Sequence, residues 1–262
     1  MSRSDAPIPA VPPGVRLIRE LPTGAFPLHH HPGWTAAFPW LVQGTTGRGT
    51  DGLDMGLFGE VPTGIAQARW RRLREVTGMR AAVHARQVHG AAVRWHDDVE
   101  PGLSIGEGTD GHATRSPGVL LTVSVADCVP IFLIAGVTHA ACVLHAGWRG
   151  IAAGVLEAGI ALLSRRMGAV PAELHVHCGP AICGECYEVG AEVVAALQLE
   201  PALAQKVRLD LRAVIAGRAL RAGIPAGQIT LSSHCTRCDA DAFWSHRGGC
   251  GERQLAVAGV RV

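Results

Sequence analysis

Three apolar runs in the middle of the chain constrain the fold most strongly. "GVLLTVSV" (118–125), "VPIFLIAG" (129–136) and "HAACVLH" (139–145) are rich in Val, Ile, Leu and Ala and carry almost no charge. Runs without polar alternation are typical of strands that are covered on both faces. The pattern therefore predicts that these segments are central strands with other layers packed on either side.

The rest of the chain supplies the elements that would cover these strands. Residue periodicity predicts helices at 65–78, 150–168, 188–198 and 210–223, and strands at 34–44, 81–90, 91–97, 172–179, 228–233 and 253–262. The strands 81–90 and 91–97 are expected to join at a turn formed by His89 and Gly90. Residues 45–64 are Gly-rich and too long for a simple connector, so they are a candidate binding loop.

The length and the sequence of the N-terminus suggest a domain organisation. The chain has 262 residues, of which 48% are hydrophobic, and it can bury a large core. We expect one domain over residues 34–262, preceded by a Pro- and His-rich arm over residues 1–33. The "HHH" triplet (29–31) in this arm is expected to be solvated.

Composition narrows the class of function. No apolar run reaches the ~18 residues that a membrane span needs, and the first residues lack the apolar core of a signal peptide, so a cytoplasmic location is expected. The net charge of +2 is spread without a Lys/Arg block, which argues against nucleic acid or an anionic membrane as a partner. Chemistry on a small molecule is the remaining expectation.

Polar residues at the strand ends suggest where that chemistry occurs. Cys128 stands between the first two apolar runs, and His145 ends the third. A catalytic zinc takes three protein ligands and leaves one position open, so His89, Cys128 and His145 would form such a site if they converge. The alternative is a buried cysteine and two histidines with ordinary hydrogen bonds.

The stretch "HAGWRGI" (145–151) has the features of an anion site. Its glycines let the backbone approach a ligand, and the helix predicted to follow offers unpaired N–H groups. Arg149 could complete the site. The alternative is that Gly147 and Gly150 only form a turn from strand to helix and that Trp148 fills the core.

A second group of cysteines forms two C-x-x-C pairs. Paired C-x-x-C units such as Cys183/Cys186 and Cys235/Cys238 are the usual sign of a closed structural zinc site. Cys178 and Cys250 lie nearby, and His246 is a spare ligand. The separation of the pairs exceeds that of compact zinc ribbons, so we favour buried free thiols.

Six stretches of the chain resemble one protein family. They are "QVHG" (87–90), "TVSVADCVPIFL" (122–133), "HAGWRG" (145–150), "GPAICGECYEVG" (179–190), "CTRC" (235–238), and "FWSHR" with "RQLAVAGV". In this order they are similar to the YfiH/YlmD-like family, also called laccase-domain or multicopper polyphenol oxidase proteins. The resemblance implies a mixed α/β fold with two packed mixed β-sheets flanked by helices. It also implies a zinc held by His89, Cys128 and His145.

The resemblance further implies an activity. Members of the family are reported to cleave adenosine, inosine, guanosine and methylthioadenosine by phosphorolysis, and to deaminate adenosine. For deamination, zinc would activate a water for attack on C6 of adenine, and Asp127 is the nearest acid in sequence. For phosphorolysis, Arg48 and Arg149, with Trp148 beside them, are the candidates for binding phosphate. The expected partners are purine nucleosides and phosphate, and the expected state is a monomer or small homo-oligomer.

The chain departs from the family pattern at several positions. The family's first motif and its Thr-Arg and "SLNLG" residues correspond here to "VQGTTGRGTDGLDMG", with Gln43, Gly47 and Asp54. The Arg-Arg pair near the C-terminus is here His246-Arg247. These differences leave the proposed metal ligands intact and bear on the choice of substrate.

Three other functions compete with the nucleoside enzyme. A copper-dependent polyphenol oxidase would need more paired histidines than the chain offers, although copper could substitute for zinc in the same site. A metal-free hydrolase of amide or cell-wall precursor bonds would use Cys128 as nucleophile and His145 as base. A zinc-stabilised interaction module would need the three ligands for stability only.

Overall fold

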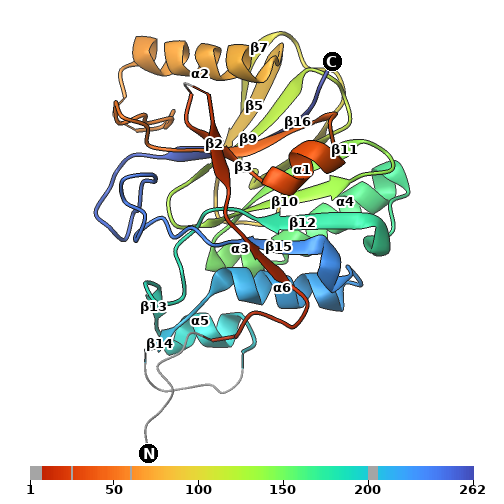
Figure 1. The fold of residues 1–262 in the computed structure, drawn as a ribbon, viewed down its shortest axis with the longest axis vertical. Coiled ribbons are helices and arrows are strands. Elements are labelled where there is room, and N and C mark those ends of the chain that lie inside the picture. Colours follow the sequence, from red (N-terminus) through yellow and green to blue (C-terminus); the bar gives the residue numbers. More distant parts are fainter. Residues whose placement is uncertain (1–7, 25, 60, 200–205) are drawn as a thin grey trace, which may run out of the picture.

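The fold consists of two seven-stranded mixed sheets and flanking helices (Figure 1). The computed structural model describes residues 8–24, 26–59, 61–199 and 206–262. The first sheet has the strand order β1 (Arg16–Ile18), β15 (Ile229–Ser232), β12 (Leu174–Cys178), β10 (Val129–Ala135), β11 (Ala140–Ala146), β8 (Gly111–Thr114), β6 (Val93–His96). The second has the order β2 (Leu21–Thr23), β3 (Leu28–His30), β4 (Leu41–Thr46), β16 (Gln254–Val260), β9 (Val119–Val125), β5 (Ala81–Arg86), β7 (Gly102–Glu107).

Helices cover the outer faces of both sheets. Helix α2 (Thr63–Thr77) packs Trp70 and Leu73 against the second sheet, and Figure 1 shows it lying over β5 and β7. In the described part of the chain, four helices cover the outer face of the first sheet, and the apolar residues between these helices and the sheet form one large buried cluster. The four helices are α3 (Trp148–Ala152), α4 (Val155–Met167), α5 (Ala191–Ala196) and α6 (Leu211–Arg221). A separate two-stranded antiparallel sheet of β13 (Glu188–Val189) and β14 (Val207–Arg208) lies beside α5.

The two sheets pack face to face, as the central apolar runs require. Phe132 and Val143 of the first sheet join Leu121 and Val123 of the second in one fully buried cluster. All three runs form strands, β9, β10 and β11, and every residue of β10 and β11 is buried. The predicted mixed α/β fold with two packed sheets flanked by helices is confirmed.

The chain passes repeatedly between the two sheets, and two of these connections bear on the site. Strand β9 belongs to the second sheet and β10 to the first, so residues 126–128 pass from one sheet to the other. Strands β5 and β6 are separated in the same way by residues 87–92. The sequence predicts both strands and the turn, but the two strands do not pair with each other, and β6 pairs in parallel with β8.

The N-terminal segment adds strands to both sheets. Within the segment expected to be an arm, β1 pairs with β15, and β2 and β3 extend the second sheet beside β4. His29 and His31 are buried, so the expectation of a solvated histidine triplet is wrong. Residues 1–7 of the expected arm lie outside the described residues.

Three predicted elements differ from those observed. The strand predicted at 34–44 is instead helix α1 (Pro32–Ala37) followed by β4, because Nδ1 of His31 accepts a hydrogen bond from Trp34 N and caps the helix. The helix predicted at 150–168 breaks into α3 and α4 at Gly154, whose φ of 86° lies in the left-handed region. The helix predicted at 188–198 contains only α5, after the two residues of β13.

Among the described residues, no helix has the length and apolar character that spanning a bilayer requires.

Candidate active site

The connections 87–92 and 126–128 and the end of β11 bring His89, Cys128 and His145 together. Strands β10 and β11 pair so that Pro130 lies opposite His145, which sets Cys128, at the entrance to β10, next to the end of β11. The ligand atoms of all three residues lie within 4.8 Å of one another. His89 is exposed, Cys128 half-buried and His145 buried, so the group faces solvent on one side.

Asp110, which the sequence analysis did not single out, holds two of these residues in place. Its Oδ1 lies 2.9 Å from Nδ1 of His145. Its carboxylate also accepts hydrogen bonds from the backbone amides of Val88, His89 and Gly90 at 2.8–3.1 Å. These bonds fix the 88–90 turn, in which His89 has the unusual φ of 58° for a residue other than glycine.

Asp110 lies just before β8, where it is fully buried. Burial disfavours its charge, but hydrogen bonds from His145 and the turn amides outweigh this and lower the pKa of Asp110 below its ordinary 3.8. The carboxylate is therefore ionised at neutral pH and able to orient His145. In the sequence, "TDGH" (109–112) carries no local pattern that separates this aspartate from an ordinary loop residue.

Cys128 and His145 form a strongly interacting pair. Burial opposes ionisation of the thiol, but the charge and hydrogen bond of His145 lower the pKa of Cys128 to about 6. Burial likewise opposes protonation of His145, but Cys128 and Asp110 raise the pKa of His145 to about 9. The pair therefore favours a thiolate at neutral pH, which is the form that binds metals or acts as a nucleophile.

The donor set and the space around it fit a metal ion. Nδ1 of His145 is engaged by Asp110, so its Nε2 is the nitrogen left for a metal, as in many carboxylate–histidine–metal arrangements. A Cβ atom at Gly147 would lie 3.0 Å from both Sγ of Cys128 and Cδ2 of His89. The glycine therefore keeps open the space between the ligands that any larger residue would enter.

The three candidate ligands line a cavity of about 1090 Å³. Its wall includes His89, Cys128, His145 and the N-terminal end of α2. The C-terminal loop contributes His246, Gly249 and residues 251–253. Residues of the Gly-rich segment, among them Asp54 and Phe58, also line it, which supports the prediction of a binding loop. A cavity of this size is ample for a ligand such as a nucleoside.

The other predicted site residues, Arg48, Asp127, Trp148 and Arg149, do not line the cavity. Arg149 is exposed and stacks on the half-buried Trp148 ring, 4.2 Å from its centroid. Trp148 also packs against the apolar cluster of the first sheet, which agrees with the alternative that this residue fills the core. Arg48 donates a hydrogen bond to the carbonyl of Ala240 and lies 4.1 Å from the Trp244 ring.

Asp127 is committed to other partners. Its Oδ1 accepts a hydrogen bond from the Thr236 hydroxyl at 2.6 Å, and its Oδ2 accepts one from the Arg247 amide at 2.6 Å. The side chain is buried and turned toward these loops. Asp127 thus anchors the turn that carries Cys128, and this geometry does not favour it as the proton donor suggested by its position in sequence.

Two further residues extend the site on the side of Arg149. Tyr187 is buried and lies within electrostatic range of Cys128, Arg149 and Arg247. The guanidinium of Arg247 lies 4.8 Å from the centroid of the Tyr187 ring. Arg247 was noted in the sequence only as a departure from the family pattern, and Tyr187 carried no separate signal.

The departures from the family pattern have structural explanations. Oε1 of Gln43 accepts a hydrogen bond from the backbone amide of His31. A side chain at Gly47 would collide with His29. Both residues therefore accommodate the buried histidines. Oδ1 of Asp54 accepts the amides of Gly56 and Arg253 and ties the Gly-rich segment to the C-terminal loop. His246 lines the cavity.

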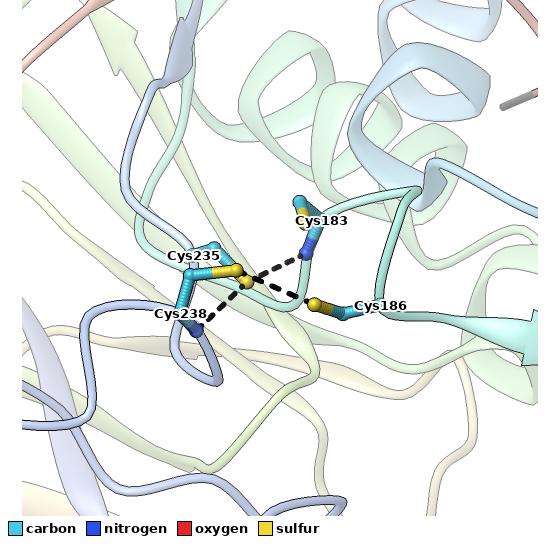
Figure 2. A group of neighbouring side chains, drawn as sticks. All are labelled: Cys183, Cys186, Cys235 and Cys238. Atoms are coloured by element: carbon cyan, nitrogen blue, oxygen red, sulfur yellow. Dashed lines mark hydrogen bonds between the residues drawn. The ribbon is translucent and has the colours of Figure 1, made fainter. Parts of the chain in front are cut away.

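The two C-x-x-C pairs meet at a second place. The Sγ atoms of Cys183, Cys186, Cys235 and Cys238 lie within 4.8 Å of one another (Figure 2). Only Cys235 is buried, whereas Cys183 and Cys186 are half-buried and Cys238 is exposed. All four are free, as expected, but the expected burial is wrong for Cys183, Cys186 and Cys238. His246, the spare ligand considered from sequence, faces the other site.

A two-sheet α/β protein with an open two-histidine, one-cysteine centre is the class that this fold and site define. The chain belongs to the family described as "Multi-copper polyphenol oxidoreductase laccase", which matches residues 43–260. This confirms the resemblance found in the sequence, including its laccase label.

Named relatives carry two activities. The purine nucleoside phosphorylase YlmD of Geobacillus stearothermophilus is 35% identical over 230 residues, which are 80% of this chain and 84% of the relative. The adenosine deaminase RL5, from an unknown prokaryotic organism, is 36% identical over 182 residues, which are 63% of this chain and 69% of the relative. The crystal structure of the Geobacillus YlmD is similar, with a TM-score of 0.85, 30% identity and coverage of 94% and 100%.

Asp110→Asn is expected to weaken metal binding at this centre by about 10–100-fold. The neutral Asn side chain cannot supply the negative charge with which the Asp110 carboxylate orients His145 and accepts hydrogen bonds from the backbone amides of the turn. Competition with a chelator of known affinity measures the change. Asp98→Asn, at an exposed position, is the matched control and should bind metal like the unmodified chain. Equal affinities for the Asp110 variant and the control would contradict the role assigned to Asp110.

Proposed function

We propose that the chain is a zinc-dependent purine nucleoside enzyme. It would cleave adenosine, inosine, guanosine and methylthioadenosine by phosphorolysis and would deaminate adenosine. The observation that carries the proposal is the open site of His89, Cys128 and His145 at the wall of a cavity in a chain whose relatives are named for these activities.

The cavity offers features suited to a nucleoside. Phe58 is 43% exposed and lines the cavity, so its exposed part offers an apolar contact to a purine base. The guanidinium of Arg86 lies 4.5 Å from the ring centroid, and the His84 ring stacks on Phe58 with centroids 5.8 Å apart, so both neighbours hold the ring in place. The ribose would then lie between the base and the three ligands. This orientation is part of the proposal.

The metal ligands supply the reactive centre. Zinc(II) suits two imidazoles and a thiolate, and copper(II) could occupy the same ligands. When bound, such an ion acts as a Lewis acid and activates water for the deamination. Asp110 would keep His145 oriented, and Gly147 would keep the space beside the ligands open for the substrate.

Phosphorolysis additionally needs an anion site. A phosphate oxygen would form a bond to C1′ while the C1′–N9 bond breaks, and the base would leave with the bonding electrons and take up a proton. Arg149 is the candidate for holding the phosphate, and Arg247 joins it because both guanidiniums lie within electrostatic range of Tyr187. Arg247 also donates a hydrogen bond to the Glu188 carbonyl at 3.1 Å. Arg48 is the third candidate, and its guanidinium contacts the Ala240 carbonyl and the Trp244 ring.

Product analysis tests the proposed function. Purified chain of known zinc content is incubated with adenosine, inosine or methylthioadenosine, with and without phosphate. We expect the free base and a pentose 1-phosphate only when phosphate is present, and inosine from adenosine in either case. Unchanged nucleosides in all reactions would contradict the proposal.

A Cys–His hydrolase is the second candidate, and one observation favours it. Cys128, His145 and Asp110 follow one another within interaction distance, in the order of a nucleophile, a base and the group that orients the base. Treatment with a chelator separates the candidates. A thiol-dependent hydrolase would retain its activity on amide substrates without metal, whereas the nucleoside enzyme would lose its activity.

The copper oxidase is disfavoured by the donor set. Coupled copper sites need further histidines close to the first three ligands. Among the described residues, the two groups able to hold a metal are His89/Cys128/His145 and the four-cysteine group. The first contains two histidines and the second none, so neither supplies the further histidines of a coupled copper site.

Arg149→Ala is expected to impair phosphorolysis of inosine more than deamination of adenosine. Only phosphorolysis binds a free anion, and the loss of a charge-assisted contact of about 1.5–3 kcal/mol corresponds to a KM for phosphate roughly 10–100-fold higher. Both reactions are measured on one preparation, which controls for misfolding and metal loss.

The exposed Arg165 at the end of α4 supplies the matched control, since Arg165→Ala should leave both reactions unchanged. Equal losses in the two reactions of Arg149→Ala would assign Arg149 to the nucleoside or to stability. No loss in either reaction would transfer the anion site to other residues, with Arg247→Ala the next variant to measure.

A further inference from the structure

The four-cysteine group lies apart from the candidate active site and has no part in the proposed reaction. Its two pairs follow β12 and β15, which are parallel neighbours, so their carboxyl ends leave the first sheet at the same edge. A bridge between Ala181 and Cys235 then holds the two loops side by side. In this way the sheet topology brings together cysteines that are 52 residues apart in sequence.

The local backbone is arranged around sulfur. Sγ of Cys235 accepts hydrogen bonds from the amides of Cys183 at 3.3 Å and Cys238 at 3.4 Å, as Figure 2 shows. The amide of Cys186 bonds the carbonyl of Cys183 at 3.0 Å and closes the first C-x-x-C turn. Amide donors to sulfur stabilise a thiolate over a thiol, which is the state that a metal ligand requires.

The arrangement does not suit the other uses of cysteine. The sulfurs of Cys186 and Cys238 are 3.4 Å apart, and all four cysteines are free. A disulfide would need about 2.05 Å and would use only two of the four. Packing in the core does not explain them either, because Cys238 is exposed.

We propose that Cys183, Cys186, Cys235 and Cys238 bind a structural zinc ion, separate from the metal of the active site. Four thiolates in two C-x-x-C turns match the closed tetrahedral site of structural zinc, which leaves no position for a substrate. The chain would accordingly bind two zinc ions.

The position of this site gives it a structural consequence for the active site. The Thr236 hydroxyl, inside the second C-x-x-C turn, donates to Asp127 Oδ1, and the Ile182 amide, beside the first turn, donates to the Asp127 carbonyl at 3.1 Å. Both cysteine loops thus hold the residue that precedes Cys128. Zinc that joins the two loops would stabilise the turn from which Cys128 reaches the other metal.

Metal analysis of the full-length chain tests the proposal. The chain is expressed with zinc in the medium and desalted, and zinc per chain is measured by elemental analysis and by native mass spectrometry. We expect two zinc ions in the unmodified chain and one in the Cys186→Ser/Cys238→Ser variant. Cys250→Ser, outside the group, is the matched control and should retain two.

X-ray absorption identifies the ligands of this zinc without disturbing the four cysteines. In Cys128→Ala, which removes a ligand of the active site, the remaining zinc should have four sulfur neighbours at about 2.3 Å and no nitrogen. This measurement also stands if the double serine variant fails to fold.

Three results would overturn the proposal. They are a single zinc in the unmodified chain that disappears in Cys128→Ala, iron in place of zinc at the sulfur site, or a Cys186–Cys238 disulfide in peptides digested without reductant. None of them depends on nucleoside turnover, so the proposal can fail while the proposed function stands.

Discussion

Cys128→Ala is expected to reduce turnover of inosine and adenosine by more than about 100-fold and to remove one equivalent of zinc. In the proposed centre the thiolate is one of three ligands, and removal of a group that merely orients such a ligand already costs about 10–100-fold in metal affinity or activity. An alanine offers no donor atom, and the two remaining histidines form too small a set for a stable catalytic zinc. Initial rates and metal content of the same preparation give both quantities.

Cys142→Ala is the matched control for this prediction. Cys142 lies in the middle of β11, fully buried among apolar residues, and burial raises the pKa of its thiol, so it is neither a ligand nor a nucleophile. The control should retain its zinc and most of its activity, with a small loss of stability. Full activity in Cys128→Ala would remove the three-ligand centre from the account.

Glu20→Ala is expected to destabilise the fold by about 3 kcal/mol or more. Oε1 of Glu20 lies 2.8 Å from Nε2 of His177, and Oε2 accepts the Ser232 hydroxyl at 2.7 Å. Glu20 is 2% exposed and His177 fully buried, so the truncation leaves buried polar groups without their partner. For a chain of this size, such a loss lowers Tm by roughly 10 °C.

Glu75→Ala is the matched control, because the Glu75 side chain is 55% exposed and forms only a surface ion pair with Arg72. Its effect should stay within about 0.5 kcal/mol. Equal effects of the two variants would show that residues before β3 are not an integral part of the fold. Thermal unfolding of both variants under the same conditions provides the comparison.

The same carboxylate predicts a dependence of stability on pH. Burial raises the pKa of Glu20, but the hydrogen bonds and charge of His177 and the Ser232 hydroxyl outweigh this and lower it below the ordinary 4.5. As the pH falls below about 4.5, the unfolded chain takes up this proton before the folded chain does. The contribution of Glu20 is therefore complete above this pH and is lost below it, so the gap in stability between the unmodified chain and Glu20→Ala should narrow in acid.

The sequence predicted what depends on local pattern. The apolar runs that became β9, β10 and β11 need no partner to be recognised, because their lack of polar residues already requires cover on both faces. His89, Cys128 and His145 could be proposed as a group because each stands where a strand or its connection ends. The motifs that contain these three residues also occur in the same order in the family that the chain resembles, and this supported the grouping.

The sequence could not predict what depends on pairing over long distances. Arg16 of β1 pairs with Thr230 of β15, and no local feature of residues 16–30 indicates strands that join two different sheets. Asp110 acquires its role only when β8 is placed beside β11. The four cysteines likewise meet only because β12 and β15 are neighbours, which spacing along the chain does not reveal.

The helix errors have a local cause that spacing also hides. Gly154 has apolar neighbours at helical spacing, but its left-handed conformation ends α3 and begins α4 in a new direction. The cap formed by His31 on Trp34 is similarly specific, since histidine is not among the residues usually preferred at that position.

The dependence of inosine phosphorolysis on metal tests the central claim most directly. Pentose 1-phosphate is measured for the unmodified chain as purified, after removal of metal with a chelator, and after zinc is restored. The account predicts that formation of pentose 1-phosphate falls to background without metal and returns with zinc. It also predicts that restored zinc revives neither Cys128→Ala nor His145→Ala. Phosphorolysis that persists at its full rate in the metal-free chain would contradict the account and leave the thiol and imidazole to act without a metal.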